Sequence, residues 1–302
     1  MYENIRAAVV GSINKDLILN MEQVPDVGEN LLGTTYSYAN GGKGANQATA
    51  LARLGAKVKM IGKVAEDENG KTLLENLQNE GIDTSCIATN GTSTGLAVII
   101  LDGEGKNRIV VYEGANAEIK SEDAVKSIEN NSFDLLLVQF ETNEEVVISS
   151  VNSAIKKGIT TVIDCGPAKA FSLEKMQGAT IVTPNESETK ALTGIYPDSE
   201  DNILKASKTL MDRSKARFII IKLGEKGCSV WDGESLTLLP AYESNVVDTT
   251  AAGDCFTAAM ALEYLKNGDI LKACDMGNKA GSIAVSRMGA QNSMPTYKEL
   301  FK

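Results

Sequence analysis

Short apolar runs rich in β-branched residues recur along the chain and constrain its fold more than any other feature. They are Ala7 to Val10, Val58 to Ile61, Leu135 to Val138, Thr160 to Ile163, Thr180 to Val182 and Phe218 to Ile221. Runs of this length are typical of buried strands. Helical spacing follows at 45–54, 72–80, 145–157, 202–213, 254–266 and 271–287. This alternation predicts an α/β fold, a mostly parallel sheet flanked by helices on both faces.

Two stretches interrupt the alternation. The apolar runs 95–101 and 107–112 are joined by Asp102-Gly103-Glu104-Gly105, which predicts an antiparallel hairpin. Residues 17–39 also lack helical spacing. We expect these pieces, from about residues 12–40 and 93–114, to pair into a small β-sheet on a single domain of residues 1–302. The small sheet is either a lid over a cleft or a hairpin without function.

The hairpin also predicts an oligomer. Val98, Ile100, Ile109 and Val111 are expected to form one apolar face. An isolated small sheet is marginally stable unless something covers it. We therefore expect a homodimer in which the small sheets of two subunits pack together.

Composition excludes several classes of protein. The 302 residues include no histidine, which removes every Ser-His-Asp triad and every His-ligated metal site. Thirty basic residues against forty acidic ones give a net charge of −10, which argues against nucleic acid or an anionic membrane as the partner. The five cysteines form no C-x-x-C pair. The first residues lack the basic flank and long apolar stretch of a signal peptide, and no apolar run approaches a length of about 18 residues, so we expect neither a signal peptide nor a membrane span. We expect a reduced, cytoplasmic protein.

Two glycine motifs resemble nucleotide-binding loops only in part. Gly70-Lys71-Thr72 precedes a helix, but Ala65 occupies the position of the first P-loop glycine and three acids would repel phosphate. Gly42-Lys43-Gly44 begins a G-x-G-x-x-G pattern that ends in Gln47, with no strand immediately before it. Both a P-loop and a dinucleotide-binding fold are therefore disfavoured.

The most informative segment is Val246 to Met260, where a strand end and a turn lead into a helix. The small residues Ala251, Ala252 and Gly253 leave the free N–H groups of the helix start open to an anion. Asp254 follows in the first turn, either as an acid favoured by the helix dipole or as a proton acceptor in phosphoryl transfer. Asp248 is either a turn residue or the anchor of a cation.

With this segment, the chain resembles the ribokinase branch of the sugar kinases, which also include fructokinases and adenosine kinases. The resemblance covers essentially the whole chain. It is carried by Asn40-Gly41-Gly42-Lys43-Gly44-Ala45-Asn46-Gln47-Ala48 and by Asp248-Thr249-Thr250-Ala251-Ala252-Gly253-Asp254. It implies a ribokinase-like fold and ATP-dependent phosphorylation of a sugar hydroxyl.

The resemblance also implies the position of the sugar. The matching residues are Asn14, Asp16, Gly42, Lys43, Asn46, Glu141 and Asp254. Asn14 and Asp16 follow the first strand, where open α/β sheets bind ligands, and both side chains can bind hydroxyls. Without the resemblance, they are equally well an Asx turn, and Glu141 is an ordinary surface acid.

For the nucleotide, the resemblance implies Asn185, Lys222, Gly224, Gly227, Gly253 and Asn278, with Asn185 and Glu188 linked to Mg²⁺. Lys222 stands where many relatives carry threonine. Gly224 and Gly227 are otherwise hairpin turn residues, Glu188 is a first-turn acid, and Asn278 is an amide on a helix surface.

A potassium site is implied by the match of Asp248, Thr250, Ala284, Arg287, Gly289 and Ser293. A K⁺ ion there would stabilise the neighbouring anion-binding loop without contacting substrate. The alternative interpretation of residues 287–293 is a helix end that faces solvent.

Together these features predict ATP-dependent phosphorylation of D-ribose at O5, with Asp254 as the general base and the amides of Ala251 to Gly253 as the anion hole. Asn14 favours ribose because related deoxyribokinases tend to carry a side chain there that forms no hydrogen bond. The alternatives are a fructokinase, a deoxyribokinase, an adenosine kinase, or a sugar or nucleotide sensor without activity.

Overall fold

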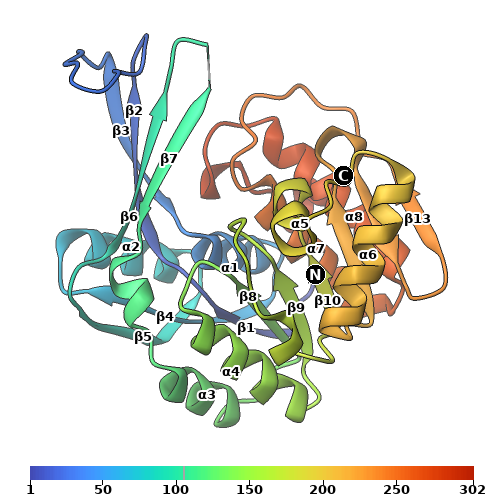
Figure 1. The fold of residues 1–302 in the computed structure, drawn as a ribbon. Coiled ribbons are helices and arrows are strands. Elements are labelled where there is room, and N and C mark those ends of the chain that lie inside the picture. Colours follow the sequence, from blue (N-terminus) through green and yellow to red (C-terminus); the bar gives the residue numbers. More distant parts are fainter. Residues whose placement is uncertain (105) are drawn as a thin grey trace.

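The computed structural model describes residues 1–104 and 106–302, so Gly105 of the predicted turn lies outside the described residues. A nine-stranded sheet runs in the order β13-β12-β11-β10-β9-β8-β1-β4-β5 (Figure 1). Its strands are β1 (Arg6–Val10), β4 (Lys57–Ala65), β5 (Asp83–Gly91), β8 (Leu135–Gln139), β9 (Thr160–Asp164), β10 (Ile181–Thr183), β11 (Phe218–Lys222), β12 (Cys228–Trp231) and β13 (Leu236–Leu239). All pairings are parallel except those of β12 with its two neighbours. The predicted fold class is confirmed.

Helices cover both faces of this sheet, and each face has its own apolar core. In β1, Ala7 and Val9 belong to one core while Ala8 and Val10 belong to the other, because side chains alternate along a strand. The first core contains α1 (Lys43–Arg53), α2 (Glu68–Asn79), α7 (Ala252–Asn267), α8 (Ile270–Val285) and α9 (Tyr297–Leu300). The second contains α3 (Ser121–Glu129), α4 (Glu144–Lys156), α5 (Glu186–Thr193) and α6 (Glu200–Ser214). Burial on both faces explains why the strands are continuous apolar runs.

The six apolar runs and six helical patterns of the alternation are all present, with ends displaced by a few residues. The expectation that a strand ends at Val246 and Val247 is wrong, because both residues are exposed and belong to no strand. The elements that sequence analysis missed are β5, β12, β13, α3, α5 and α9. β5 is an edge strand with only one buried side chain, Ile87, so its sequence lacks the apolar run that marks the central strands. Among the described residues, the helices are all too short or too polar to span a bilayer.

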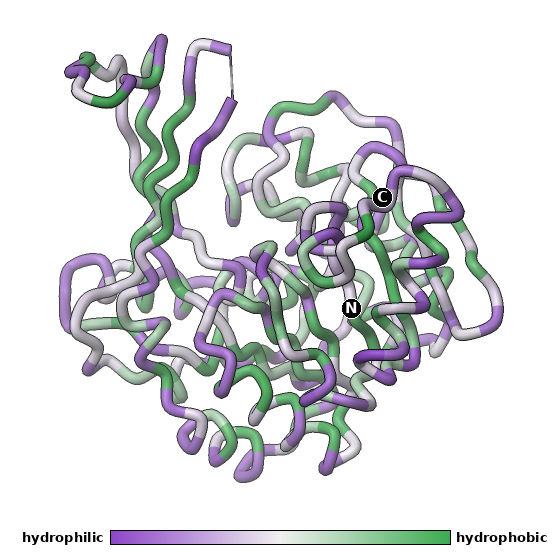
Figure 2. Tube along the Cα trace, viewed as in Figure 1, coloured by the Kyte–Doolittle hydropathy of each residue, from purple (hydrophilic) through white to green (hydrophobic). Residues whose placement is uncertain are grey.

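A second, four-stranded sheet stands away from the first, in the order β3-β2-β6-β7. Its strands are β2 (Asn14–Asn20), β3 (Thr35–Gly41), β6 (Gly95–Leu101) and β7 (Asn107–Tyr112). Figure 2 shows that apolar residues continue along this projecting sheet, although little of the chain covers them. The expected hairpin and its pairing with the N-terminal segment are both observed.

The expectation of a single apolar face on the hairpin is wrong. Val98 is paired with Val110, and Ile99 with Ile109, and residues that face each other across a pair share one side of the sheet. Val98 and Ile100 therefore lie on one face, whereas Ile109 and Val111 lie on the other. The strands expose apolar side chains on both faces, since Ile109 is 54 % and Val110 is 68 % exposed.

Glycines let the start of α1 approach the loop after β1 closely. Gly42 has φ of +89°, and a Cβ there would lie 2.7 Å from the backbone nitrogen of Asn14. A Cβ on Gly44 would lie 2.7 Å from the backbone of Gly11 and Ser12. Only glycine tolerates both the conformation and the contact. This packing brings the first turn of α1 against the carboxyl edge of the large sheet.

Candidate active site

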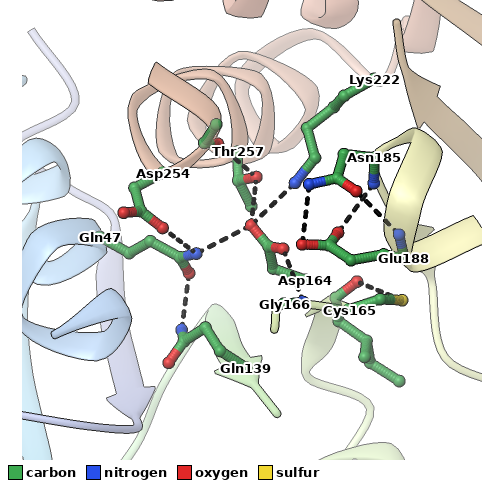
Figure 3. Close-up of polar contacts among 12 residues, drawn as sticks. Gln47, Gln139, Asp164, Cys165, Gly166, Asn185, Glu188, Lys222, Asp254 and Thr257 are labelled. Atoms are coloured by element: carbon green, nitrogen blue, oxygen red, sulfur yellow. Dashed lines mark hydrogen bonds and ion pairs between the residues drawn. The ribbon is translucent and has the colours of Figure 1, made fainter. Parts of the chain in front are cut away.

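Polar side chains gather where the central parallel strands end. Gln139, Asp164 and Lys222 are the last residues of β8, β9 and β11, and Asn14 begins β2 shortly after β1. The carboxyl ends of parallel strands share one edge of a sheet, which is where ligands of open α/β folds bind. Helices α1 and α7 approach the same edge and contribute Gln47, Asp254 and Thr257 (Figure 3).

Asp254 lies in the first turn of α7 and is 4 % exposed. Its two carboxylate oxygens accept hydrogen bonds from Asn46 Nδ2 at 3.0 Å and from Gln47 Nε2 at 3.1 Å. Burial raises the pKa of Asp254 to about 6, with Lys43 opposing the rise and Asp164 adding to it. A carboxylate held at fixed orientation with a pKa of this size is suited to accept a proton near neutral pH.

The start of α7 presents unpaired amides beside this carboxylate. Ala251 caps the helix with φ of +60°, a left-handed conformation that is strained for alanine. The amide of Ala252 donates to the carbonyl of Thr249 at 3.3 Å. Among the residues that the structure describes, the amides of Ala251 and Gly253 find no acceptor. They form a small concave donor site of the kind that binds anions.

Among the residues predicted for the sugar, Asn14 and Asp16 are buried at the base of the small sheet. Asn14 Oδ1 accepts a hydrogen bond from Asn116 Nδ2 at 2.7 Å, which orients the amide. Burial, together with the nearby charge of Glu141, raises the pKa of Asp16 to about 7. Glu141 in turn accepts from the backbone N–H of Lys43 at 3.0 Å and from the Ser12 hydroxyl. The predicted sugar residues are thus brought together, and Glu141 is not an ordinary surface acid.

Lys43 connects the sugar side to the rest of the site. Burial opposes its charge, but the carboxylates of Asp254, Asp164, Glu141 and Glu188 surround it and hold the pKa of its ammonium group above the usual range. Lys43 also lines the neighbouring cleft. Lys43 therefore supplies a positive charge where the residues predicted for the sugar meet the neighbouring cleft.

A cleft of about 1300 Å³ lies next to these residues, and Lys43 and Asp254 line it. Its walls contain all the residues predicted for the nucleotide, namely Asn185, Lys222, Gly224, Gly227, Gly253 and Asn278. The loop of Gly224 to Gly227 connects the antiparallel strands β11 and β12, so its glycines are hairpin residues as well as cleft residues. Asn278 is buried and donates to the carbonyl of Pro240 at 3.1 Å, so the interpretation as a helix-surface amide is wrong.

Asn185 and Glu188 form a capping box at the start of α5. Asn185 donates from its backbone N–H at 2.8 Å and from Nδ2 at 3.0 Å to the two carboxylate oxygens of Glu188. Burial raises the pKa of Glu188, with Lys222 opposing the rise. Across residues 1–104 and 106–302, no three acids or cysteines converge as a metal site. A divalent ion here would take most of its oxygen ligands from phosphate and water.

Comparison with known proteins identifies the family. The family model described as pfkB family carbohydrate kinase matches residues 4–297. The chain belongs to this family. It is 37 % identical to the ribokinase of Bacillus subtilis (strain 168) over 97 % of each chain, and 32 % identical to the deoxyribokinase of Salmonella typhi over 97 % of this chain and 96 % of that protein. The structure of Arabidopsis thaliana ribokinase complexed with ribose and ATP matches with a TM-score of 0.89, 30 % identity, and coverage of 98 % of this chain and 97 % of the other.

The loop before α7 of this kinase is joined to the end of α8. The backbone N–H groups of Val247 and Asp248 donate to the carbonyl of Val285 at 2.7 and 3.1 Å. The carboxylate of Asp248 accepts from the Thr250 N–H at 2.9 Å and from the Gly289 N–H at 2.8 Å. The residues predicted for potassium thus lie on two adjoining segments, while the side chain of Arg287 turns to Glu299 at 2.7 Å.

Sequence analysis missed four polar residues of the candidate site: Gln47, Gln139, Asp164 and Thr257. Asp164 Oδ2 accepts from Gln47 Nε2, Thr257 Oγ1 and Lys222 Nζ, each at 3.0 Å. Gln139 Nε2 donates to Gln47 Oε1 at 2.6 Å. A signal for Asp164 was present, because it directly follows the apolar run 160–163 and strand-end residues reach the ligand edge.

Proposed function

We propose that this kinase transfers the terminal phosphoryl group of ATP to O5 of D-ribose, giving D-ribose 5-phosphate. The observation that carries the proposal is the position of Asp254, a buried carboxylate that lines the cleft of about 1300 Å³ and lies, like Glu141, beside Lys43. Identity of 37 % to a ribokinase along the whole chain supports ribose as the acceptor. The match to a ribokinase complexed with ribose and ATP supports ATP as the donor.

Asp254 is proposed to take the proton of the sugar hydroxyl as the bond to phosphorus forms. The transition state of phosphoryl transfer is loose, so the base acts late and need not be strong. The amides of Ala251 and Gly253, with Ala252 between them, stabilise charge on the moving group, and each well-aimed donor of this type is typically worth about 3 kcal/mol of barrier. The ammonium of Lys43, which lines the same cleft, adds a positive charge near these amides.

Mg²⁺ fits the cleft with Asn185 and Glu188 as its protein contacts, directly or through water. Both residues are hard oxygen donors that line the cleft, and Glu188 is 3 % exposed. When bound, the ion would neutralise charge on the phosphates. Potassium is proposed at the junction of Asp248, Thr250, Ala284, Arg287, Gly289 and Ser293, where it would stabilise the loop that carries the donor amides.

Ribose is preferred over deoxyribose because Asn14 can bind a hydroxyl. Asn116 fixes one end of its amide and leaves Nδ2 to donate to the sugar. A site built to bind a hydroxyl rejects the analogue without it by up to about 10⁴-fold. Deoxyribose is the second candidate, since a deoxyribokinase is also 32 % identical along the whole chain.

The deciding experiment measures ATP turnover with ribose, deoxyribose, fructose and adenosine, each in potassium and in sodium. We expect turnover with ribose alone, increased by potassium. Preferred turnover of another acceptor would overturn the ribose proposal, and equal rates in the two salts would overturn the potassium proposal. Asn14→Leu should raise the ratio of deoxyribose to ribose turnover, while Asn152→Leu, on helix α4 away from the site, should leave that ratio unchanged.

We further propose that the chain is one domain whose small sheet, from about residues 12–40 and 93–114, acts as a lid and as the contact of a homodimer. A cleft of about 620 Å³ supports the role of a lid, because Val111 and Tyr112 of the small sheet line it together with Glu141. Exposed apolar side chains on both faces, among them Tyr38 and Ile109, support a partner sheet.

The proposed location is the cytoplasm, a reducing compartment, and the five free cysteines agree with it.

A further inference from the structure

Asp164 is the most connected side chain of the site, yet the mechanism gives it no role. It is 2 % exposed. Three donors from three different elements meet at its Oδ2 atom: Gln47 of α1, Thr257 of α7 and Lys222 of β11, each at 3.0 Å. Its Oδ1 atom accepts from the Gly166 N–H at 3.3 Å. Figure 3 shows Asp164 between Gln47 on one side and Lys222 on the other.

The first connection leads to the proposed base. Gln47 Nε2 donates both to Asp164 Oδ2 and to Asp254 Oδ1, so one amide group bridges the two carboxylates. Gln139 donates to the amide oxygen of Gln47 at 2.6 Å, which fixes which end of the amide faces the acids. Asp164 therefore determines where Gln47 lies, and Gln47 helps to determine the orientation of Asp254.

The second connection leads to the proposed anion hole. The ammonium of Lys222 is 3.7 Å from the point where a Cβ on Gly253 would lie, so Asp164 holds it beside the donor amides of α7. Burial opposes the charges of both partners, but each holds the other charged: the pKa of Asp164 lies below its usual value and that of Lys222 above it. The pair thus keeps a positive charge within the cleft wall.

We propose that Asp164 is a positioning residue for phosphoryl transfer, which holds Asp254 through Gln47 on the sugar side and Lys222 beside the anion hole on the nucleotide side. This rests on the proposed function. Asp164 itself needs no contact with sugar or phosphate. Its two connections fix the base on one side of Asp164 and a cation on the other, and misplacement of a reacting group by about 1 Å can cost about 10²-fold in rate.

The test compares Asp164→Asn and Gln47→Leu with the parent enzyme, using kcat, KM for ribose and the pH dependence of kcat. The charged or titratable groups around Asp254 are Lys43 of α1, Asp164 of β9 and Cys255 of its own helix. Asp164→Asn removes a like charge, so the acidic limb of the kcat profile should move to lower pH. Gln47→Leu removes a donor to Asp254, so the limb should move to higher pH.

In both variants kcat should fall by about 10- to 10²-fold, with a much smaller change in KM for ribose. A role in folding alone does not move the limb in opposite directions. Asp134→Asn, which breaks an ion pair with Arg6 at the opposite end of the sheet, is the control and should leave kcat and the pH profile unchanged. If Asp164→Asn fails to fold, Gln47→Leu decides, because it changes no charge.

Variants that keep kcat within about threefold of the parent, or whose acidic limb does not move, overturn the positioning role. The parent enzyme separates this result from a failure of the proposed function. If the parent does not phosphorylate ribose, the proposed function is wrong. If the parent does so and the variants match it, only the role of Asp164 is wrong.

Discussion

The two sheets bury their side chains to very different extents. In the large sheet, Ile219 and its neighbours in β11 are fully enclosed between two layers of helices. In the small sheet, Ile109 is 54 % exposed in a strand without a single buried residue. The carboxylate of Asp254, the proposed base, and the side chains that hold it rest against the enclosed sheet, where neighbours hold each rotamer. The exposed sheet leaves its apolar side chains open to a second surface, which suits the proposed lid and interface.

The largest effect is expected for Asp254, at the edge of the enclosed sheet. Asp254→Asn should lower kcat by at least about 10³-fold, because proton transfer to a positioned base is lost. Ribose affinity, measured by calorimetry, and the thermal midpoint should change little. Asp201→Asn alters another first-turn acid, in α6, and should leave kcat unchanged. Near-normal turnover of Asp254→Asn would assign Asp254 only a role with the helix dipole.

The same substitution in each sheet measures the difference in burial directly. Ile219→Ala should lower the free energy of unfolding by about 3 kcal/mol, because it opens a cavity in a packed core. Ile109→Ala should change it by less than about 0.5 kcal/mol in the monomer, because little packing is lost. Urea denaturation of both variants at low concentration tests this. An equal loss of unfolding free energy in the two variants would show that the small sheet is packed as tightly as the large one.

Acid should lower the activity before it unfolds the protein, because Asp254 at the edge of the enclosed sheet takes up a proton. The pKa of Asp254 is about 6, so kcat should rise tenfold per pH unit up to about pH 6 and then level off. The folded protein binds this proton more tightly than the unfolded chain does. This group therefore favours folding below about pH 4, and its contribution is lost as the pH rises to about 6. A kcat that does not vary across this window contradicts the role of Asp254.

The smallest change in monomer stability is expected when the exposed sheet is altered on both faces at once. Ile109→Lys combined with Val110→Lys places charge on each side of β7, because neighbouring residues of a strand point in opposite directions. Sedimentation should show dissociation of the dimer, while circular dichroism of the monomer is unchanged. A parent enzyme that is already monomeric at micromolar concentration would contradict the proposed interface.

The central strands and the helices between them were predictable because burial on two faces demands uninterrupted apolar runs such as Leu135 to Val138. β5 was missed since an edge strand carries no such run. The faces of the hairpin were predicted wrongly because register decides them: the pairing of Ile99 with Ile109 is set across two strands and cannot be inferred from either strand alone.

In the candidate site, sequence alone determined the segments that carry chemistry. Asp254 follows residues too small to cover the donor amides. Gly42 and Gly44 allow close backbone contact. Both properties depend only on neighbouring residues in the chain. Only the tertiary structure decided that Gln47 and Asp164 belong to this site and that both are linked to Lys222 there. These residues are more than fifty positions apart along the chain, and their hydrogen bonds form only where parallel strands and two helices bring their ends to one edge.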